Sequence, residues 1–401
     1  MKKSIAIIGG GAAGLMLASS LDESQFDITI YEQNNTLGRK FLVAGDGGLN
    51  LTHSEPLTSF LTKYHPKGFL DQCISAFPNS SLVQWLQDLG IETFIGSSAR
   101  IFPQRGIKPI QVLMTIIEHI KSKNISIQCN HTWMGWNEDM QLVFQTKEQK
   151  VNLTFDIIIF SLGGASWKKT GSNGLWSKRF EEKNIKIIPF QASNCAFGIH
   201  WPADFLKTAE GQSLKNIAIQ CEQKSLKGEL MITQFGLEGS AIYALSHEIR
   251  NQLNTNGEAK IYIDLKPQLA VDQIEWSLKH RANQSIQKIL STKIKCSSES
   301  IALLKNTLSK EEFINPTMLA HGIKHLPLTI YALAPIDEAI STVGGVALNE
   351  VNSYFELKKL SHHYVIGEML DWDAPTGGYL LQASFSMGYF LAQHLNSEKK
   401  K

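Results

Sequence analysis

The sequence predicts an α/β protein: a Rossmann-like domain built on a parallel sheet, with an inserted β-barrel-like domain and a helical subdomain. Three observations predict this class. A glycine-rich turn separates an apolar run from a helical stretch within residues 4–21, and an acidic residue ends the next apolar run. From about Pro189 the chain has short β-like runs and then helical patterns, and the earlier α/β pattern resumes near residue 335. A chain of 401 residues is long enough for two or three domains.

The first element is a strand, a turn and a helix, "SIAIIGGGAAGLMLASSL". The strand is expected over 5–8, and the turn has the spacing Gly9-x-Gly11-x-x-Gly14. The first glycine permits the tight turn, the second lets the backbone approach a pyrophosphate, and the third lets the helix pack on the strand. Two lysines before an apolar run also imitate a secretory signal, but the triple glycine disfavours a helical core and no A-x-A site follows.

The second strand, "FDITIYE", ends at Glu32, eighteen residues after Gly14, and Gln33 follows. A carboxylate there accepts hydrogen bonds from ribose hydroxyls and repels a 2′-phosphate, which favours FAD or NAD over NADP. Ala12 and Ala13 begin the helix, whose free N–H groups and positive dipole end face the phosphates. A bound dinucleotide is therefore predicted.

The segment "GRKFLVAGDGGLNLTHSE" (38–55) follows the second strand. Its glycines, Gly47 and Gly48 among them, make a loop with few side chains, and Arg39 and Lys40 supply positive charge beside it. Such a loop is expected to lie along an extended cofactor; a surface loop rich in turn residues is the alternative. Thr52 and Glu55 have the spacing of a capping box and predict a helix start.

The C-terminal segment returns to the same site. A strand is expected over 364–366, followed by Gly367 and Glu368, and the pair Gly377-Gly378 opens a helix that runs through His394. The N–H groups of this helix would face the O2 and N1 end of an isoalloxazine ring, where negative charge develops on reduction. Glu368 would bond the ribityl or ribose part of the cofactor.

The domain limits follow from the texture of the chain. A strand "DIIIFSLGG" ends at Gly163-Gly164, and apolar spacing predicts a helix over 108–120 with Ile110 on its buried face. Short β-like runs follow Pro189, and helical patterns follow 266. We expect a cofactor domain at 1–188 and 335–401, a β-rich insert at 189–265 and 322–334, and a helical insert at 266–321. Ser309 and Glu312 predict a capping box.

Composition restricts the remaining possibilities. The net charge is +2, and there is neither a basic aromatic stripe nor an apolar run of membrane-spanning length. We therefore expect no nucleic-acid or membrane partner. Five scattered cysteines and twelve histidines form no metal-binding or dithiol spacing, which favours a reducing cytoplasm and no metal.

The motifs also carry a family resemblance. Together with "RIFP", "GGASWKKTGSNG", "GELMITQFGLEGSAI" and "TVGGVALNE", they fall in the order found in a bacterial flavoprotein family. The chain resembles the BaiN/YhiN-like family, labelled NAD(P)/FAD-dependent oxidoreductases and aminoacetone-oxidase-like, over nearly its whole length. One departure marks a distinct branch: the common loop "GGGRCNLTN" here reads "GDGGLNLTH".

The resemblance implies FAD in a glutathione-reductase-like FAD fold, a three-domain layout and two-electron chemistry. Matching positions implied as FAD contacts are Gly9, Gly11, Gly14, Glu32, Arg39, Lys40, Gly48, Asn50, Gly164, Glu368, Gly378 and Gln382. To these we add their neighbours Ala12, Ala13, Gln33, Gly47, Leu51, Gly163, Gly377 and Tyr379. Substrate-side candidates are Trp167, Lys169, Thr233, Gln234 and Phe235, with packing as the alternative.

We therefore expect an FAD-dependent oxidoreductase that transfers a hydride between flavin N5 and a small-molecule substrate, with NAD(P)H as a possible transient reductant. A flavin amine oxidase that produces hydrogen peroxide is one alternative. A non-catalytic redox sensor or RNA-modification accessory protein is another. The sequence identifies no catalytic residue and no oligomeric state.

Overall fold

A computed structural model describes residues 2–43 and 48–398. The chain divides into two compact units, one comprising Met1–Ala192 and Ile336–Lys401 and the other Ser193–Pro335. The second unit is thus an insertion in the sequence of the first. The predicted Gly47 lies outside the described residues.

A five-stranded parallel sheet, ordered β20-β10-β1-β2-β6, organises the first unit. Its central strand β1 places Ile5 opposite Ile157 on one side and Ile28 on the other. Every residue of β10 is buried, as expected for a parallel strand covered on both faces. The bounds are β1 (Lys3–Ile8), β2 (Phe26–Glu32), β6 (Ser126–Cys129), β10 (Ile157–Phe160) and β20 (His363–Val365).

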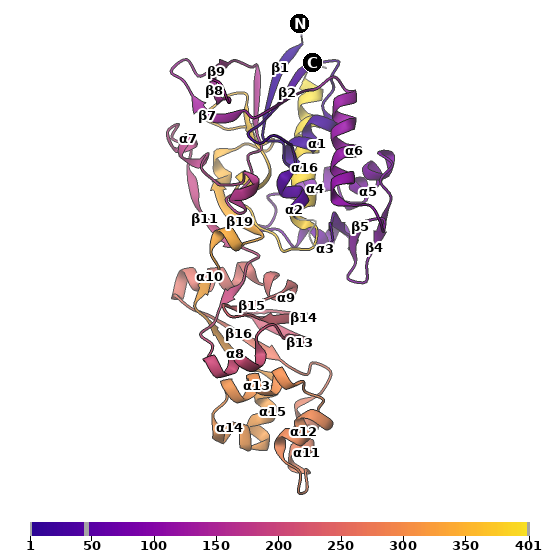
Figure 1. Cartoon of the computed structure of the whole chain (residues 1–401), viewed down its shortest axis with the longest axis vertical. Helices are drawn as coiled ribbons and strands as arrows, with labels where there is room; N and C mark the ends of the chain where they lie inside the picture. The colour runs from indigo at the N-terminus through magenta and orange to yellow at the C-terminus, as the bar shows by residue number, and fades with distance from the viewer. Residues whose placement is uncertain (1, 44–47, 399–401) are drawn as a thin grey trace. The chain divides into compact units, whose positions relative to one another are not determined.

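Three helices pack together beside this sheet: α1 (Ala12–Ser20), α6 (Pro109–Ser122) and α16 (Tyr379–Ser397) (Figure 1). Helix α1 is buried almost all round. Its contact with α16 is close because Gly388 has no side chain: a Cβ there would lie 2.4 Å from the Ala13 carbonyl oxygen. The N-terminal and C-terminal parts of the chain therefore form one core.

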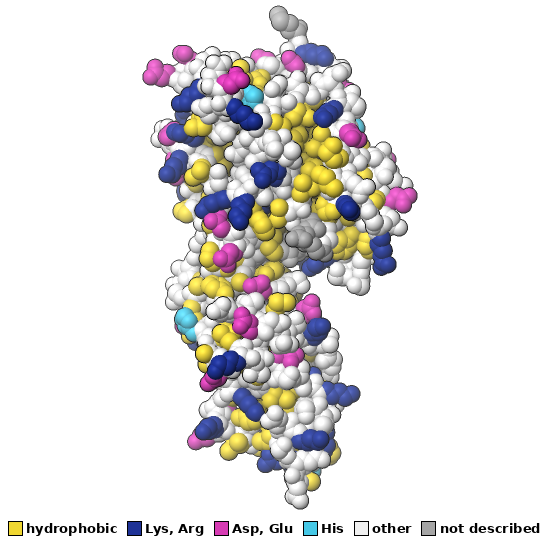
Figure 2. Space-filling model, in the orientation of Figure 1, with side chains coloured by type: hydrophobic (Ala, Val, Ile, Leu, Met, Phe, Trp, Pro, Cys, Tyr) yellow, Lys and Arg dark blue, Asp and Glu magenta, His cyan; other side chains and the backbone are white. Residues whose placement is uncertain are grey.

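The exposed face of α6 departs from the prediction. Leu113, Ile117 and Ile120 are buried as the spacing predicts, but Ile110 is 45% exposed, because Val112 and Ile116 complete the face of the helix that the core covers. Met114 is also exposed, and apolar side chains gather over α6 in Figure 2.

Smaller elements complete the first unit. The β7-β8-β9 sheet packs aromatic side chains against the parallel sheet, and the centroids of the Trp133 and Phe160 rings are 4.8 Å apart. The smaller elements of the first unit are α2 (Arg39–Val43), α3 (Leu57–Leu61), α4 (Asp71–Ala76), α5 (Asn79–Asp88), α7 (Ser177–Glu181), β3 (Thr52–His53), β4 (Thr93–Ile95), β5 (Arg100–Pro103), β7 (Thr132–Trp136), β8 (Leu142–Gln145), β9 (Lys150–Leu153), β11 (Ile187–Ser193), β19 (Ser341–Val346) and the 3₁₀ turns η1 (Lys168–Thr170), η2 (Ile336–Glu338), η3 (Leu348–Glu350) and η4 (Gly367–Met369).

The predicted capping box at Thr52 and Glu55 is wrong. Thr52 belongs to the short strand β3, and the next helix, α3, begins only at Leu57 after Pro56. The Glu55 carboxylate instead accepts a hydrogen bond from the Tyr379 hydroxyl, 324 residues away in the sequence. Glu55 therefore has a partner far away in the sequence and not the local helix cap that its spacing predicts.

The second unit is a seven-stranded antiparallel sheet with helices. Its strands are ordered β17-β16-β13-β14-β15-β12-β18, and its strands and helices share one hydrophobic core. The capping box of Ser309 and Glu312 is confirmed at the start of α14. The bounds are β12 (Phe197–Gly198), β13 (Ser213–Cys221), β14 (Lys224–Ile232), β15 (Gly236–Glu238), β16 (Ala259–Asp264), β17 (Leu326–Ile330), β18 (Ala332–Leu333), α8 (Ala203–Ala209), α9 (Ser240–Tyr243), α10 (Ser246–Asn256), α11 (Val271–Lys279), α12 (Ile286–Thr292), α13 (Ser298–Thr307), α14 (Lys310–Ile314) and α15 (Pro316–Lys324).

The described residues offer neither a membrane-spanning helix nor a cluster of metal ligands. None of the helices in 2–43 and 48–398 is both long and apolar enough to cross a membrane. Within the same ranges, His, Cys, Asp and Glu side chains form no group of three or more that could hold a metal ion.

Candidate functional site: a cavity at the carboxyl edge of the parallel sheet

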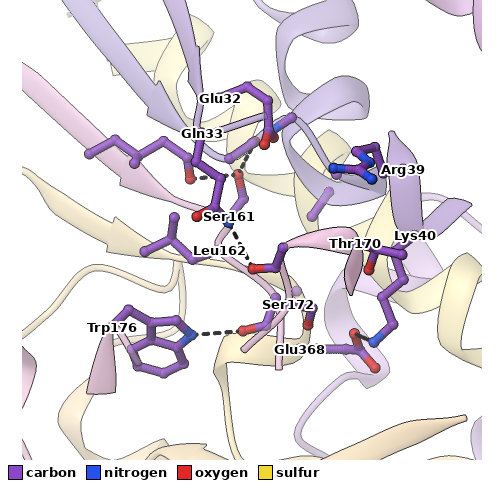
Figure 3. A pocket seen from close by; sticks show the side chains of 18 of the residues that line it. Glu32, Gln33, Arg39, Lys40, Ser161, Leu162, Thr170, Ser172, Trp176 and Glu368 are labelled. Atoms are coloured by element: carbon purple, nitrogen blue, oxygen red, sulfur yellow. Dashed lines mark hydrogen bonds and ion pairs between the residues drawn. The ribbon is translucent and has the colours of Figure 1, made fainter. Parts of the chain in front are cut away.

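A cavity of about 440 Å³ lies within the first unit, where the parallel strands β1, β2, β10 and β20 end (Figure 3). The carboxyl ends of parallel strands are where α/β sheets bind their ligands. The lining includes ten of the sequence-predicted cofactor residues, namely Gly9, Gly11, Ala12, Ala13, Glu32, Gln33, Arg39, Lys40, Gly163 and Glu368.

The three spaced glycines have different surroundings. Gly9 has φ +107°, and a Cβ there would lie 2.4 Å from the Ser161 carbonyl oxygen. At Gly14 a Cβ would lie 2.3 Å from the Gly9 carbonyl oxygen, so this glycine permits close packing of α1 and does not line the cavity. At Gly11 a Cβ would meet no heavy atom within 4 Å. Gly11 therefore leaves open space at the N-terminus of α1.

The Glu32 carboxylate is buried and held in place at the end of β2. Its Oε2 accepts a hydrogen bond from the Gly10 N–H (3.0 Å), and its Oε1 accepts from the backbone N–H (2.9 Å) and side-chain amide (2.7 Å) of Asn34. The Arg39 guanidinium donates to the Asn34 Oδ1 at 2.7 Å. This chain of bonds orients an acidic group beside the glycine turn, as ribose recognition requires.

An ion pair crosses another side of the cavity. The Lys40 ammonium on α2 lies 2.7 Å from the Glu368 carboxylate on η4 and donates to the Ser166 hydroxyl at 3.1 Å. Figure 3 shows the two side chains of the pair pointing toward each other. Lys40 is 27% exposed and Glu368 14% exposed, so water partly screens the pair.

The loop after β10 forms another part of the wall, beside Gln33 and Asn34. The Gln33 amide donates to the Gly171 carbonyl (2.7 Å), and the Ser172 hydroxyl donates to the Gly164 carbonyl (3.0 Å). The Trp176 indole N–H donates to the Gly163 carbonyl at 2.9 Å. These bonds fix the Gly163-Gly164 turn, although Gly164 itself is not among the cavity-lining residues.

A second group of predicted residues lies outside the described lining but packs together. A Cβ on Gly378 would lie 2.5 Å from the Thr52 Cα, so β3 and the start of α16 meet closely. The Tyr379 hydroxyl donates to the Glu55 carboxylate, and burial, followed by this bond, raises the pKa of Tyr379 well above its usual value. Gly48, Asn50, Leu51 and Gly377 belong to the same two segments.

Several buried polar atoms in this second group have no hydrogen-bond partner among the described residues. They are the Asn50 Oδ1, the Thr52 Oγ1 and the Gln382 Oε1. Gln382 is fully buried, and its amide nitrogen donates to the Phe77 carbonyl (2.9 Å) and the Ser386 hydroxyl (3.1 Å). Buried polar atoms without partners are rare and call for a ligand or water.

The substrate-side candidates are distributed over both units. Trp167 is 36% exposed and adopts a left-handed backbone (φ 64°, ψ 55°) before η1, and Lys169 lies within η1. Thr233, Gln234 and Phe235 form a turn in the second unit, where the Thr233 N–H donates to the Gly236 carbonyl. None of these five belongs to the cavity lining described above.

Sequence reasoning missed several lining residues. Ser161, Ser172, Trp176 and Arg179 follow β10, and His131 to Met134 lie at the start of β7. The Ser161 hydroxyl donates to the Gly9 carbonyl at 2.7 Å and so fixes the glycine turn. Ser172 lies within the quoted stretch GGASWKKTGSNG, whose match could have suggested it, whereas His131 to Met134, Ser161, Trp176 and Arg179 carry no motif.

The geometry fits an extended dinucleotide. Open space at Gly11 and the α1 N-terminus suits a pyrophosphate, and the oriented Glu32 carboxylate suits a ribose, whereas the unpartnered Asn50 Oδ1 and Gln382 Oε1 are buried and do not line the cavity. The lining groups therefore fit the pyrophosphate and one ribose of a dinucleotide such as FAD.

The chain is similar to known proteins over nearly its whole length. The profile described as the HI0933-like protein Rossmann domain matches residues 3–394. A ribosomal RNA dihydrouridine synthase of Haemophilus influenzae is 24% identical over 98% of both chains. A 3-dehydro-bile acid delta(4,6)-reductase of Clostridium scindens is 24% identical over 96% of this chain and 97% of its own.

Solved structures support the fold. The 3-ketosteroid-delta4-(5alpha)-dehydrogenase of Rhodococcus jostii RHA1, in complex with 4-androstene-3,17-dione, aligns over 98% of this chain and 96% of its own. The TM-score is 0.50 and the identity is 10%, so this likeness concerns the fold alone.

Proposed function

Because the chain belongs to the HI0933-like family, a family of FAD-dependent oxidoreductases, we propose that it reduces a carbon–carbon double bond conjugated to a carbonyl group. The observation that carries the proposal is the cavity at the sheet edge, with its glycine turn, oriented Glu32 and Lys40–Glu368 pair. Bound FAD would supply the hydride through its N5 atom.

The relatives guide the choice of acceptor. One relative is named for its product, dihydrouridine, and the other for its substrate, a delta(4,6) 3-dehydro-bile acid. In both reactions a ring double bond next to a carbonyl group is reduced. A small molecule remains our expected substrate, and a uracil ring within RNA is the competing one. NAD(P)H is proposed as the reductant.

The chain's own residues have distinct proposed roles. Gly9, Gly11, Ala12 and Ala13 hold the pyrophosphate against the N-terminus of α1, and Glu32 and Gln33 bind the ribose. Arg39, Lys40, Gly163, Gly164 and Glu368 enclose the middle of the cofactor. Asn50, Leu51, Gly377, Gly378, Tyr379 and Gln382 surround the flavin ring, and Gly14 permits the close packing of α1. We also propose a cytoplasmic location, since all five cysteines are free.

The test is an anaerobic titration of the purified holoprotein. NADH and then NADPH are added while the flavin absorbance is followed, and an acceptor is added once the absorbance has bleached. Bleaching followed by recovery with uridine-containing RNA or with a steroid dienone supports the proposal and identifies the acceptor. A flavin that resists both nucleotides but consumes oxygen with a small amine would replace the proposal with an amine oxidase. A protein that binds no FAD would overturn it altogether.

A further inference from the structure

A second cavity, of about 480 Å³, lies within the second unit. Its lining comes from three segments: residues between 211 and 216 on and before β13, residues 265 and 266 after β16, and residues between 295 and 300 around the start of α13. Of the side chains in this lining, only that of Leu265 is apolar. The cavity shares no residue with the one at the sheet edge of the first unit, so the cofactor does not account for it.

Three lysines from these segments, Lys215, Lys266 and Lys295, line the cavity together. None of them forms an ion pair with a carboxylate in the described part of the chain, whereas the neighbouring Lys324 is paired with Asp264 at 2.6 Å. Like charges that share a cavity repel one another, and an anion bound between them removes that cost. The lining therefore favours a negatively charged ligand.

Irregular backbone places two of these lysines at the cavity. The pairing of β13 with β14 shifts in register between Leu214 and Ile217, which leaves Lys215 and Asn216 outside the regular ladder, as in a β-bulge. Lys295 precedes the start of α13 and has φ 58°, in the left-handed region. Both lysines are exposed, so a ligand that enters the cavity from solvent can contact their ammonium groups.

Lys266 is held by bonds to neighbouring segments. Its N–H donates to the Asp264 carboxylate at 2.9 Å, and its carbonyl accepts from the Lys324 ammonium at 2.9 Å. Its own ammonium donates to the Lys295 carbonyl, which joins two of the three lining segments. Because an ammonium group has three donors, two remain for a ligand.

The start of α13 adds hydroxyl groups and one carboxylate to the lining. Ser297 caps the helix, and its hydroxyl lies 3.0 Å from that of the buried Ser300. Burial alone would raise the pKa of Glu299, but hydrogen bonds from its own N–H and from neighbouring serine hydroxyls, together with the nearby Lys215 cation, lower it. Glu299 is the one acidic residue of the lining, so the three ammonium groups leave an excess of two positive charges.

We infer that this cavity binds a small phosphate-bearing dianion, with Lys215, Lys266 and Lys295 around the phosphate group. A phosphomonoester carries about −1.5 to −2 charge at pH 7 and offers three acceptor oxygens to ammonium and hydroxyl donors. A monocarboxylate would neutralise only half of the excess positive charge. The inference goes beyond the proposed function, because it concerns the second unit and assumes neither a flavin nor an acceptor.

The test is isothermal titration calorimetry on the full-length protein with inorganic phosphate, glycerol 3-phosphate and acetate as probes. Lys215→Met and Lys295→Asn each remove one ammonium group, and asparagine suits the left-handed backbone at 295. Glu299→Gln removes the opposing charge and keeps an oxygen that can accept hydrogen bonds at the helix start. Lys227→Met is the matched control, because Lys227 is an exposed lysine of the adjacent strand β14 that does not line the cavity. The melting temperature of each variant reports its folding.

We expect saturable binding of phosphate that weakens about tenfold in Lys215→Met and in Lys295→Asn and tightens about threefold in Glu299→Gln. Lys227→Met should bind like the wild type, and all variants should melt close to it. Acetate should bind about tenfold more weakly than phosphate or worse. Tighter binding of glycerol 3-phosphate than of inorganic phosphate would identify a phosphomonoester as the ligand, and the reverse order would identify the free ion.

The absence of saturable binding of either phosphate probe up to about 10 mM would overturn the inference. So would an unchanged phosphate affinity in both lysine variants, an equal loss in Lys227→Met, or acetate that binds as tightly as phosphate. A short oligoribonucleotide that binds through Lys215 where neither phosphate probe binds would also overturn it and replace the small ligand with a nucleic-acid strand. If Lys215→Met melts far below the wild type, the opposite shifts expected for Lys295→Asn and Glu299→Gln still test the inference.

Discussion

The surroundings of Gly11 and Gly14 permit a test that separates cofactor binding from folding. Gly11 is the N-cap of α1 and Gly14 lies in its first turn, and both can be changed to alanine. A methyl group on Gly11 would meet no heavy atom within 4 Å, whereas one on Gly14 would lie 2.3 Å from the Gly9 carbonyl oxygen and 2.7 Å from the Ser161 hydroxyl. The same substitution should therefore have opposite consequences at the two positions.

The expected magnitudes follow from these distances. Gly11 has φ −81° and ψ −175°, which alanine adopts freely, so the gain from a less flexible unfolded chain, about 0.4–1 kcal/mol, offsets a similar loss at the helix N-cap. The free energy of unfolding of Gly11→Ala without FAD should stay within about 1 kcal/mol of the wild type. Gly14→Ala overpacks the strand–helix contact and should cost about 1–3 kcal/mol.

Gly11→Ala should weaken FAD binding although it leaves the stability of the FAD-free protein almost unchanged. The Gly11→Ala methyl occupies the space that we assign to the pyrophosphate, and losing one charge-assisted hydrogen bond there costs about 1.5–3 kcal/mol. FAD affinity should fall about tenfold to a hundredfold. The assay is denaturant unfolding of the FAD-free proteins, combined with FAD titration followed by flavin fluorescence. Unchanged FAD affinity in Gly11→Ala, or a Gly14→Ala protein as stable as the wild type, would refute the reasoning.

Three further predictions concern the same unit. A double-mutant cycle with Lys40→Met and Glu368→Gln should give a coupling free energy of about 0.5–1 kcal/mol in urea unfolding, since the pair is partly screened; a value near zero would mean that the pair is incidental. Burial is the main cause that lowers the pKa of His363, so the unfolded chain takes up the proton first as the pH falls below about 6.5. Stability should then decline toward acid, and less steeply in His363→Gln; parallel pH profiles would contradict this. Burial raises the pKa of the Cys73 thiol to about 12, whereas Cys129 is half-buried, so a thiol reagent at pH 8 should label Cys129 well before Cys73 in the folded protein, as peptide mapping would record.

The sequence predicted features whose causes lie within a few residues of one another. The spacing of Gly9, Gly11 and Gly14, the strand ending at Glu32 and the helix opened by Gly378 are all local, and the structure has a strand, turn or helix at each of these places. Apolar periodicity correctly predicts a helix at α6, but it wrongly predicts that Ile110 is buried. A helical pattern does not say which of two neighbouring faces the rest of the chain will cover.

The sequence could not predict partners far apart along the chain. Capping-box spacing predicts a local partner for Glu55, whose carboxylate is instead bonded to the Tyr379 hydroxyl, and Lys40 contacts Glu368 at a separation of 328 residues. Trp176 and Arg179 line the cavity without any motif to mark them. Such contacts depend on which strands become neighbours in the sheet, and no window of sequence contains that information.

By itself, then, the sequence determined the βαβ unit with its glycine turn and acidic strand end, because short-range sterics and hydrogen bonding decide turns, caps and amphipathic periods. Only the tertiary structure decided which side chains meet across these segments, such as Lys40 with Glu368 and Glu55 with Tyr379, and which residues after β10 line the cavity at the sheet edge. The physical reason is that the parallel order β20-β10-β1-β2-β6 arises from burying all these strands together, which is a property of the whole core.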